Sequence, residues 1–348
     1  MTNLATTHIA MAQSAYDQLQ VIRDALCNSP ELTAKTDIQS VAHLVDNKIV
    51  DNQTTETDLY SLPGDDCAAI PNGDGYQLLA MEGMLPEFVK QDPWHAGWSS
   101  VMANVSDIAA MGGRATAVVN AYWHHDQAEA AQMLKGIKKA CDVFGVRLAG
   151  GHTSMSASHQ AGLAVSVLGY ATHLLSCHHL RPGQCVYMVA DLNGQWHGDK
   201  PYWNAVTGKK REQIRSMWNL LPEIAESGLV TSAKDISNGG VLGTLLMMLE
   251  LTKLGATIDL NEIPAPAGQV DFIRWLKAFQ SFGFLLAGPP EHAMEVQQYF
   301  SSYHITCKPI GTITERPTVV FDYYEASMEF WDLAQKPITG ITFADRKP

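Results

Sequence analysis

The stretch from Pro93 to Gly113 reads PWHAGWSSVMANVSDIAAMGG, and Asp107 is its only formally charged residue. It is long enough for about five helical turns. A helix that is apolar or small on nearly every face is normally buried. A buried carboxylate remains ionised only beside a cation or several hydrogen-bond donors. The stretch therefore predicts a buried helix whose Asp107 interacts with a cation or with such donors.

The chain is long enough for two domains. Its 348 residues exceed the usual span of one compact core. Apolar residues make up 46% and charged residues 17%, which is ordinary for a globular protein. The apolar pattern breaks between His173 and Gly183, and this break predicts the domain boundary. We expect an N-terminal helical segment at residues 1–50, a first domain at 51–172 and a second domain at 173–348.

Charge and cysteine usage exclude several classes of protein. The formal net charge is -12, with 36 acidic and 24 basic residues, which argues against nucleic acid or an anionic membrane as a partner. The chain offers neither a basic start followed by an apolar run nor about 18 uninterrupted apolar residues. Its six cysteines are widely spread and form no CxxC pair. We expect a cytoplasmic protein.

Strand and helix patterns alternate along the chain. Asp92 and Pro93 are suited to the N-cap and the first position of the helix described above. The other predicted helices span 14–29, 37–46, 127–144, 206–219, 239–254 and 270–279, and the predicted strands span 76–84, 115–122, 161–171, 186–192, 256–260, 283–288, 306–314 and 318–323. The fold class predicted from this pattern is α/β, of the α+β kind.

Two acidic motifs of the first domain are candidate magnesium ligands. Gly64-Asp65-Asp66 sits at a turn, where adjacent carboxylates repel each other and a bridging cation would relieve the repulsion. A plain surface turn is the alternative, since aspartate favours turns. Glu82 lies at the carboxyl end of a predicted strand, where α/β proteins gather ligands, and a structural capping role is its alternative.

Asp107 is the stronger candidate, because Asn104 lies three residues earlier on the same helix face. Gly97 and Ser100 extend this small, polar strip. The alternative is a buried aspartate that neighbouring backbone donors satisfy.

Two glycine-rich segments could receive an anion. Gly150-Gly151-His152-Thr153-Ser154 predicts a turn with exposed backbone amides, in which the histidine could equally be a hydrogen-bonded structural residue. The segment from Asp235 to Gly240 precedes an apolar helix, with Ser237 or Asn238 available as its N-cap. An anion could bind at the positive end of that helix, and capping without a ligand is the alternative.

Five motifs, taken in order, resemble the ATP-dependent superfamily of aminoimidazole ribonucleotide synthetase. They read GDDCAAI, MEGM, NVSDIAAMGG, AGGHTS and DISNGG. Thiamine-monophosphate kinase, selenophosphate synthetase and a hydrogenase maturation factor are other members of this superfamily. The chain looks most like a branch described as related to aminoimidazole ribonucleotide synthetase.

The resemblance implies a two-domain PurM-like fold, in which the N-terminal sheets of two subunits form a barrel and the C-terminal domain is an α/β sandwich. It also implies ATP and Mg²⁺ as cofactors. The metal ligands would be Asp65, Asp66, Glu82 and Asp107. Residues near the nucleotide would be Gly64, Asn104, Asp107, Gly150, Gly151, Thr153 and Gly239, and the catalytic candidates would be Asp235, His152 and Asn238.

Three positions depart from the pattern of the best-known members. Glu82 falls where relatives usually have aspartate, and His152 replaces an acidic residue after the two glycines. Asn238 replaces the aspartate of the DISDG motif in thiamine-monophosphate kinase.

Together, the motifs and the resemblance predict a homodimeric enzyme. It would use Mg-ATP to phosphorylate or activate a small-molecule substrate, as a kinase, a ligase or a cyclo-ligase does. Two alternatives stay open. One is a protein of the same fold that binds or senses nucleotides without catalysis, and the other is a metal-dependent hydrolase. The loop at 193–204, rich in aromatic residues and histidine, could line the substrate pocket or pack within the protein.

Overall fold

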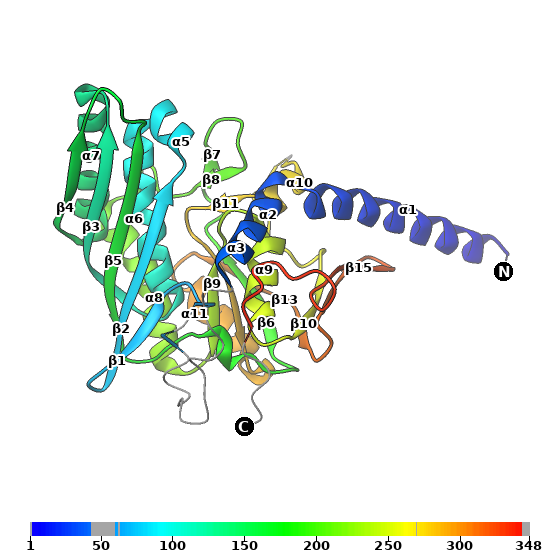
Figure 1. Ribbon diagram of the computed structural model, residues 1–348. Coiled ribbons are helices and arrows are strands. Elements are labelled where there is room, and N and C mark those ends of the chain that lie inside the picture. Colours follow the sequence, from blue (N-terminus) through cyan, green and yellow to red (C-terminus); the bar gives the residue numbers. More distant parts are fainter. Residues whose placement is uncertain (1, 43–59, 62, 269, 343–348) are drawn as a thin grey trace. The chain divides into compact units, whose positions relative to one another are not determined.

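The computed structural model describes residues 2–42, 60–61, 63–268 and 270–342 (Figure 1). Contacts divide the chain into two compact units. The five-stranded unit comprises Gln53–Leu175 and Gly208–Gly228, and the seven-stranded unit comprises Met1–Asn52, Ser176–Thr207 and Leu229–Pro348. This division groups the predicted ranges differently: the N-terminal segment joins the seven-stranded unit, and residues 173–175 and 208–228 join the five-stranded one.

The sheet of the five-stranded unit has the order β1-β2-β5-β3-β4. Its strands are β1 (Ala68–Asn72), β2 (Gly75–Met84), β3 (Arg114–His124), β4 (Arg147–Met155) and β5 (Gly162–Ala171). All neighbours are antiparallel except β3 and β4, which are parallel and joined through the predicted helix α7 (Gln127–Phe144). The Asp126 side chain caps the start of α7, and Gly145 ends the helix with a φ of 77°.

Helix α6 (Pro93–Ala110) confirms the prediction for the stretch around Asp107. The side chain of Asp92 accepts a hydrogen bond from the His95 amide at 3.1 Å, and Pro93 occupies the first turn. The helix packs against β2, β3 and β5 of the sheet and against α7 and α8 (Arg211–Ser227). A Cβ at Gly97 would lie 2.0 Å from the carbonyl oxygen of Met133 on α7. Gly97 therefore serves the close contact of the two helices.

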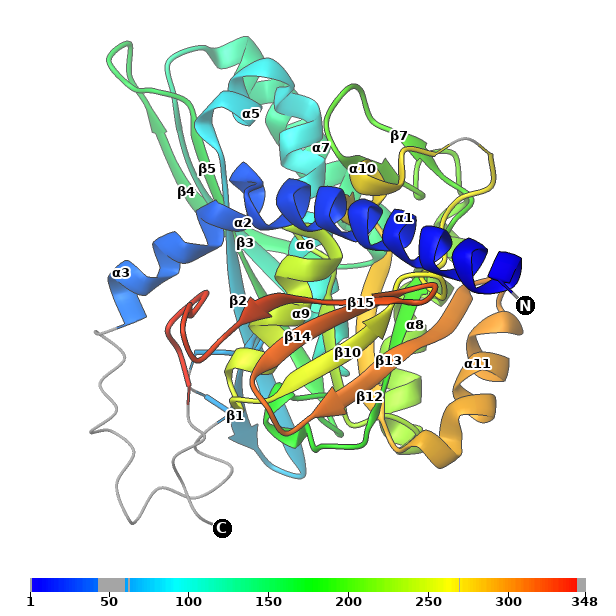
Figure 2. The same cartoon turned by 90° about the vertical axis from the view of Figure 1, so that its right-hand side faces the viewer.

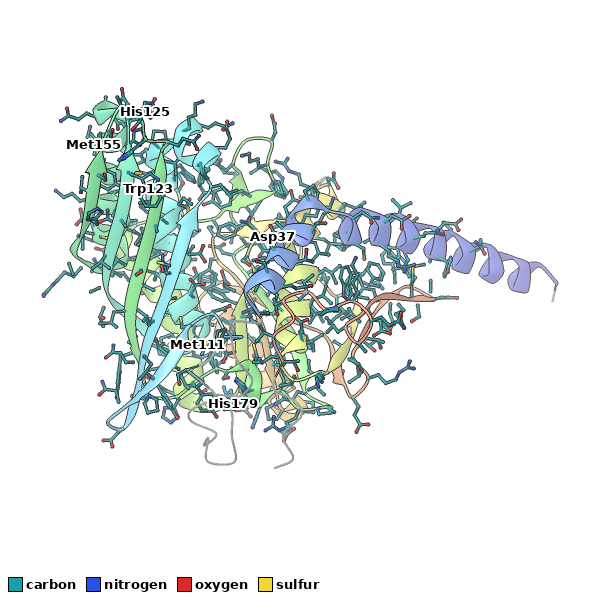
Figure 3. All side chains as sticks on the ribbon, in the orientation of Figure 1. Asp37, Met111, Trp123, His125, Met155 and His179 are labelled. Atoms are coloured by element: carbon teal, nitrogen blue, oxygen red, sulfur yellow. The ribbon has the colours of Figure 1, made fainter. Side chains whose placement is uncertain are left out.

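The opposite face of this sheet carries exposed apolar side chains. Side chains alternate between the two faces of a strand, so Val118, Asn120 and Tyr122 of β3 face the helices and are buried. The residues between them face the other way. Val119 is 45% exposed and Trp123 43% exposed, and Figure 3 labels Trp123 near one end of the sheet.

The seven-stranded unit has a sheet of order β15-β14-β10-β13-β6-β12-β9 (Figure 2). The strands are β6 (Cys185–Ala190), β9 (Ser232–Asp235), β10 (Gly255–Asp259), β12 (Gly283–Gly288), β13 (Thr306–Thr314), β14 (Thr318–Tyr323) and β15 (Ala326–Asp332). A small second sheet joins β7 (Gln195–Trp196), β8 (Tyr202–Asn204) and β11 (Phe279–Gln280). The strands predicted from 186 to 323 are confirmed, and β9 and β15 were not predicted.

Helices α1, α9 and α11 contact this larger sheet, and α2 and α10 contact α1 and α9. The helices of the described part of this unit are α1 (Thr2–Cys27), α2 (Pro30–Lys35), α3 (Gln39–Ala42), α9 (Gly240–Glu250), α10 (Phe272–Leu276) and α11 (Ala293–Ser301). Helix α1 contacts β14 and β15, and α9 contacts β9, β10 and β12. Leu19 and Leu26 of α1 share one buried cluster with Leu245 and Leu249 of α9. The N-terminal segment is therefore part of this unit's core.

Several predicted boundaries are corrected. The helix predicted at 270–279 is the short α10, because Phe279 begins β11 instead. The helix predicted at 37–46 is a short 3-10 turn followed by α3, and its last residues, 43–46, lie outside the described residues. Within the described part of the chain, no helix is both long and apolar enough to cross a membrane. All six cysteines are free thiols.

Candidate functional site

The carboxylates of Asp66 and Asp107 meet in the five-stranded unit. Each offers a carboxylate oxygen within 4.8 Å of the other. Asp107 lies on α6 and is only 7% exposed, whereas Asp66 lies in the segment before β1 and is half-buried. Two motifs that are 41 residues apart in the sequence are thereby brought together, as the magnesium hypothesis requires.

The turn that carries Asp65 and Asp66 needs a glycine. Gly64 has a φ of 145°, a region that side-chain-bearing residues rarely adopt. A backbone hydrogen bond from Ala69 to the carbonyl of Tyr60, 2.7 Å long, ties the two ends of this segment together. Asp65 is half-buried beside Asp66.

Asn104 is fully buried one helical turn before Asp107. Its Nδ2 group donates to the carbonyl of Ser100 at 2.7 Å and to the carbonyl of Val165 on β5 at 3.0 Å. Its Oδ1 atom has no hydrogen-bond partner among the described residues. A buried amide oxygen without a donor is costly, which indicates that this atom has a partner that is not part of the described chain.

Glu82 and Gly151 lie in one row across the sheet. In the strand register Glu82 of β2 pairs with Val165 of β5, Val165 pairs with Asn120 of β3, and Asn120 pairs with Gly151 of β4. Glu82 is on the face covered by α6, because its neighbour Met81 is 68% exposed on the other face. Three strand spacings separate Glu82 from Gly151, about 14 Å in total. The two positions are therefore too far apart to share one metal ion.

The turn predicted at 150–154 is wrong: these residues belong to the edge strand β4. The register shifts between Val118 and Val119, and Gly150 has a φ of 150° at this irregularity. A Cβ at Gly151 would lie 2.1 Å from the carbonyl oxygen of Asn120. The two glycines therefore serve a bulged strand that runs very close to β3.

His152 and Thr153 point to opposite faces of β4. His152 pairs with Ala121, which lies on the open face, whereas Thr153 pairs with Tyr122, which is buried under the helices. Both side chains are exposed. Within the five-stranded unit His152 is thus on the other side of the sheet from Asn104 and Glu82.

Asn120 was not predicted as a site residue. It is 8% exposed, faces the helices in the same row as Glu82, and its Oδ1 atom lies 2.7 Å from the place of a Cβ on Gly151. The sequence signal was available: an asparagine at an inward position of a strand that otherwise buries valine and tyrosine.

The seven-stranded unit holds the other candidates. Asp235 is the last residue of β9 and is 7% exposed, and Asn238 is exposed. The predicted N-cap of α9 is wrong, because Gly239, with a φ of 101°, holds that position without a side-chain hydrogen bond. Thr244 secures the segment by accepting a hydrogen bond from the Ser237 amide and donating one to the Asp235 carbonyl.

Gly240, the second glycine of this segment, allows the backbone to approach Leu276 closely. Gly240 has a φ of 61°, and a Cβ there would lie 2.1 Å from the carbonyl oxygen of Leu276. The Gly240 amide donates to the Ser237 carbonyl at 3.0 Å, and the N-cap residue Gly239 provides no side-chain hydrogen bond to the amides that follow.

The carboxylate oxygens of Asp66 and Asp107 in the five-stranded unit are suitable ligands for magnesium. Bonds of about 2.1 Å place two ligands of one octahedral ion about 3.0 to 4.2 Å apart, and the Asp66 and Asp107 oxygens lie within 4.8 Å. At that separation the two charges repel by about 3 to 4 kcal/mol at an effective dielectric constant of about 20. A divalent cation would convert this repulsion into attraction.

Cysteine chemistry is disfavoured at four of the thiols. Burial raises the pKa of Cys27 and Cys185, that of Cys141 to about 11 and that of Cys307 to about 12. These side chains are thiols rather than nucleophilic thiolates at neutral pH.

The chain belongs to the AIR synthase related protein family. The N-terminal domain of this family matches residues 64–171, and its C-terminal domain matches residues 183–323. An uncharacterized protein of Synechocystis sp. is 43% identical over 280 residues, which cover 80% of this chain and 86% of that protein.

Solved structures share the fold. PurL of T. maritima, complexed with ATP, superimposes with a TM-score of 0.66 at 18% identity, over 81% of this chain and 47% of that one. The chain thus spans about half the length of that protein. The protein named AaThiL, complexed with AMPPCP and TMP, gives a TM-score of 0.59 at 15% identity, over 83% of this chain and 95% of that one. The two-domain PurM-like fold is confirmed, and solved structures that share it include complexes with ATP and AMPPCP.

Proposed function

We propose that this protein binds Mg-ATP and transfers or uses its γ-phosphoryl group to activate a small-molecule substrate. The observation that carries the proposal is the pair of Asp66 and Asp107 carboxylates, with the buried Asn104 one helical turn before Asp107. The ATP and AMPPCP complexes of PurL and AaThiL support it, because this chain shares their fold. The reaction class is that of a kinase, a ligase or a cyclo-ligase.

The five-stranded unit would supply the metal and nucleotide site. Asp65, Asp66, Glu82 and Asp107 would hold magnesium, which when bound neutralises charge between phosphate oxygens. Asn104, held by its hydrogen bond to the Val165 carbonyl, would lie near the nucleotide. Phosphate oxygens would be received by backbone amides at Gly64, Gly150 and Gly151 and by the Thr153 hydroxyl. Catalysis would rest on fixed charges and dipoles rather than on a covalent step.

The seven-stranded unit would receive the acceptor substrate. Asp235, held at the end of β9, would orient the acceptor group. Asn238 and the amide of Gly239 would hydrogen-bond to its oxygens. His152 stays a candidate acid or base, although its side chain lies on the face of the sheet opposite to Asn104 and Glu82.

We further propose that the protein is a cytoplasmic homodimer that associates through the open face of the five-stranded sheet. Four apolar side chains that point to this face, Leu79, Met81, Val119 and Leu168, are 40% to 68% exposed. The register places Met81 and Val119 on either side of Ser166, so these side chains form a continuous surface. A second copy would bury that surface in an isologous contact.

Calorimetry of ATP binding, with and without magnesium, tests the proposal. Asp107→Asn should weaken Mg-ATP binding by at least tenfold, because a magnesium ligand is lost, whereas the control Asp74→Asn, an exposed position of the same unit, should leave it unchanged. Equal ATP affinity with and without magnesium would refute the proposed site.

Two further outcomes identify the alternatives. Mg-ATP binding without release of ADP or phosphate across a broad metabolite panel would favour a nucleotide-sensing protein. Strong protection against thermal unfolding by a transition metal, with none from ATP, would favour a hydrolase.

A further inference from the structure

A cavity of about 420 Å³ lies beside α6 in the five-stranded unit. Its lining comes from the second half of α6, the first residues of β3, the end of α7 and α8. The volume falls within the range of about 300 to 1,000 Å³ that is usual for small-molecule sites. Val105 and Ala109 line it from α6, two residues before and two residues after Asp107. At about 100° per residue they project about 160° away from Asp107 around the helix, so the cavity is distinct from the metal site.

Aromatic and aliphatic side chains supply the apolar part of the lining. Phe144 at the end of α7 and Trp218 of α8 have ring centroids 4.8 Å apart and ring planes at 76°. Trp218 is 6% exposed, and its indole Nε1 donates to the Ser106 hydroxyl at 3.2 Å, which fixes the ring. Val146, after α7, is also 6% exposed and lines the same cavity. These side chains offer a rigid surface to the apolar part of a ligand.

Arg215 of α8 supplies a fixed positive charge to this cavity. Its Nε atom donates to the Val143 carbonyl at 2.9 Å, and its Nη2 atom donates to the Asp142 carbonyl at 2.7 Å. The guanidinium also lies close to Gly145, because a Cβ there would be 2.9 Å from the Cζ atom of Arg215. The two hydrogen bonds use one edge of the planar group, so Nη1 can donate to an anion without any change in this arrangement.

The charge around the cavity is positive. Arg114 also lines it and pairs with Glu226, whereas the two carbonyls that Arg215 contacts carry no formal charge. Among the described residues, no acidic side chain is part of the lining. The adjoining segments 135–147 and 208–216 contain eight basic and two acidic residues, although the whole chain has a net charge of -12. This local excess of positive charge favours an anionic ligand.

We propose that this cavity binds a small organic anion, with its phosphate or carboxylate group at Arg215 and its apolar part against Phe144 and Trp218. The exposed Ser216, which also lines the cavity, supplies a hydroxyl as a second donor to the anionic group. The site is additional to the proposed nucleotide and acceptor sites and does not depend on them.

Calorimetry of the full chain with phenyl phosphate and with inorganic phosphate tests this site. Phenyl phosphate should bind at least tenfold more tightly than inorganic phosphate, because its ring is buried against Phe144 and Trp218. Arg215→Met should weaken phenyl phosphate binding at least tenfold, because a charge-assisted hydrogen bond is lost. The matched control is Arg211→Met, which removes an exposed arginine of the same helix outside the cavity and should change the affinity by less than about threefold.

Ser216→Trp keeps the test decisive if Arg215→Met fails to fold. The position is exposed on α8, and an indole there would fill the cavity, so binding should weaken at least tenfold. The affinity for phenyl phosphate should be the same with and without Mg-AMPPCP. The inference would be overturned if the wild type bound phenyl phosphate no better than inorganic phosphate, or if both variants bound it like the wild type. Displacement of phenyl phosphate by Mg-AMPPCP would also overturn it, because the probe would then occupy the nucleotide site.

Discussion

Glu250, the last residue of α9, holds the C-terminal segment of the seven-stranded unit, and replacing it with glutamine should destabilise that unit. The carboxylate is 5% exposed and accepts four hydrogen bonds. Oε1 accepts from the amides of Ile338 at 2.8 Å and Gly340 at 3.1 Å. Oε2 accepts from the amide and the hydroxyl of Thr339 at 2.7 and 2.5 Å.

Glutamine keeps one acceptor oxygen and turns an NH₂ group toward two donors. Loss of two charge-assisted hydrogen bonds, at about 1.5 to 3 kcal/mol each, sets the upper range at about 3 to 6 kcal/mol. The segment can instead detach and hydrate its amides, so we expect a destabilisation of about 2 to 4 kcal/mol. The control Glu329→Gln, at an exposed position of β15, should change stability by less than about 0.5 kcal/mol.

Urea unfolding and hydrogen exchange together measure this effect. Glu250→Gln should lower the free energy of unfolding by the stated amount and accelerate exchange of the Ile338, Thr339 and Gly340 amides. Unchanged stability together with unchanged exchange at these amides would refute the reasoning that the carboxylate holds the segment.

Three other predictions address the sheet face, the buried amide and an ion pair. Met81→Asp should convert the dimer to monomers in sedimentation experiments, whereas Met294→Asp, at an exposed methionine of α11, should not; a monomeric wild type would contradict the proposed interface. Gln280→Met should stabilise the protein by about 1 to 2 kcal/mol in urea unfolding, because it removes buried polar atoms that have no hydrogen-bond partner among the described residues, and a loss of stability would show that the amide is satisfied. The hydrogen bond from Arg114 lowers the pKa of Glu226, so this group adds stability above its unfolded pKa of about 4.3 that is lost as the pH falls through the lower folded pKa. The stability difference between wild type and Glu226→Gln should therefore shrink on acidification, and a constant difference would contradict the pairing.

Local sequence patterns predicted most elements of the fold. Asp92 and Pro93 mark the start of α6, and the amphipathic pattern of α7 predicts its bounds at 127 and 144. These signals are short-range, because caps and periodicity depend on neighbouring residues. The helix α11 and the strand β15 were missed, although each has an ordinary amphipathic or alternating pattern.

The features that the sequence could not predict depend on contacts between residues far apart in the chain. Gly150 and Gly151 read as a turn, yet pairing with β3 makes them part of a strand. Nothing near Ser237 in the sequence indicates that Lys35 contacts it, because that contact depends on α2 packing against α9. The pairing of Asp66 with Asp107 was reached through resemblance to a family, since spacing alone does not place two distant carboxylates together.

Anomalous diffraction from a crystal of the full chain grown with Mn²⁺ and AMPPCP tests the central claim most directly, because manganese replaces magnesium at oxygen sites and is visible by its anomalous signal. The proposal predicts a manganese peak about 2.1 to 2.3 Å from carboxylate oxygens of both Asp66 and Asp107, with nucleotide phosphate bound to the same ion. Bound nucleotide with no peak at these two carboxylates would contradict it.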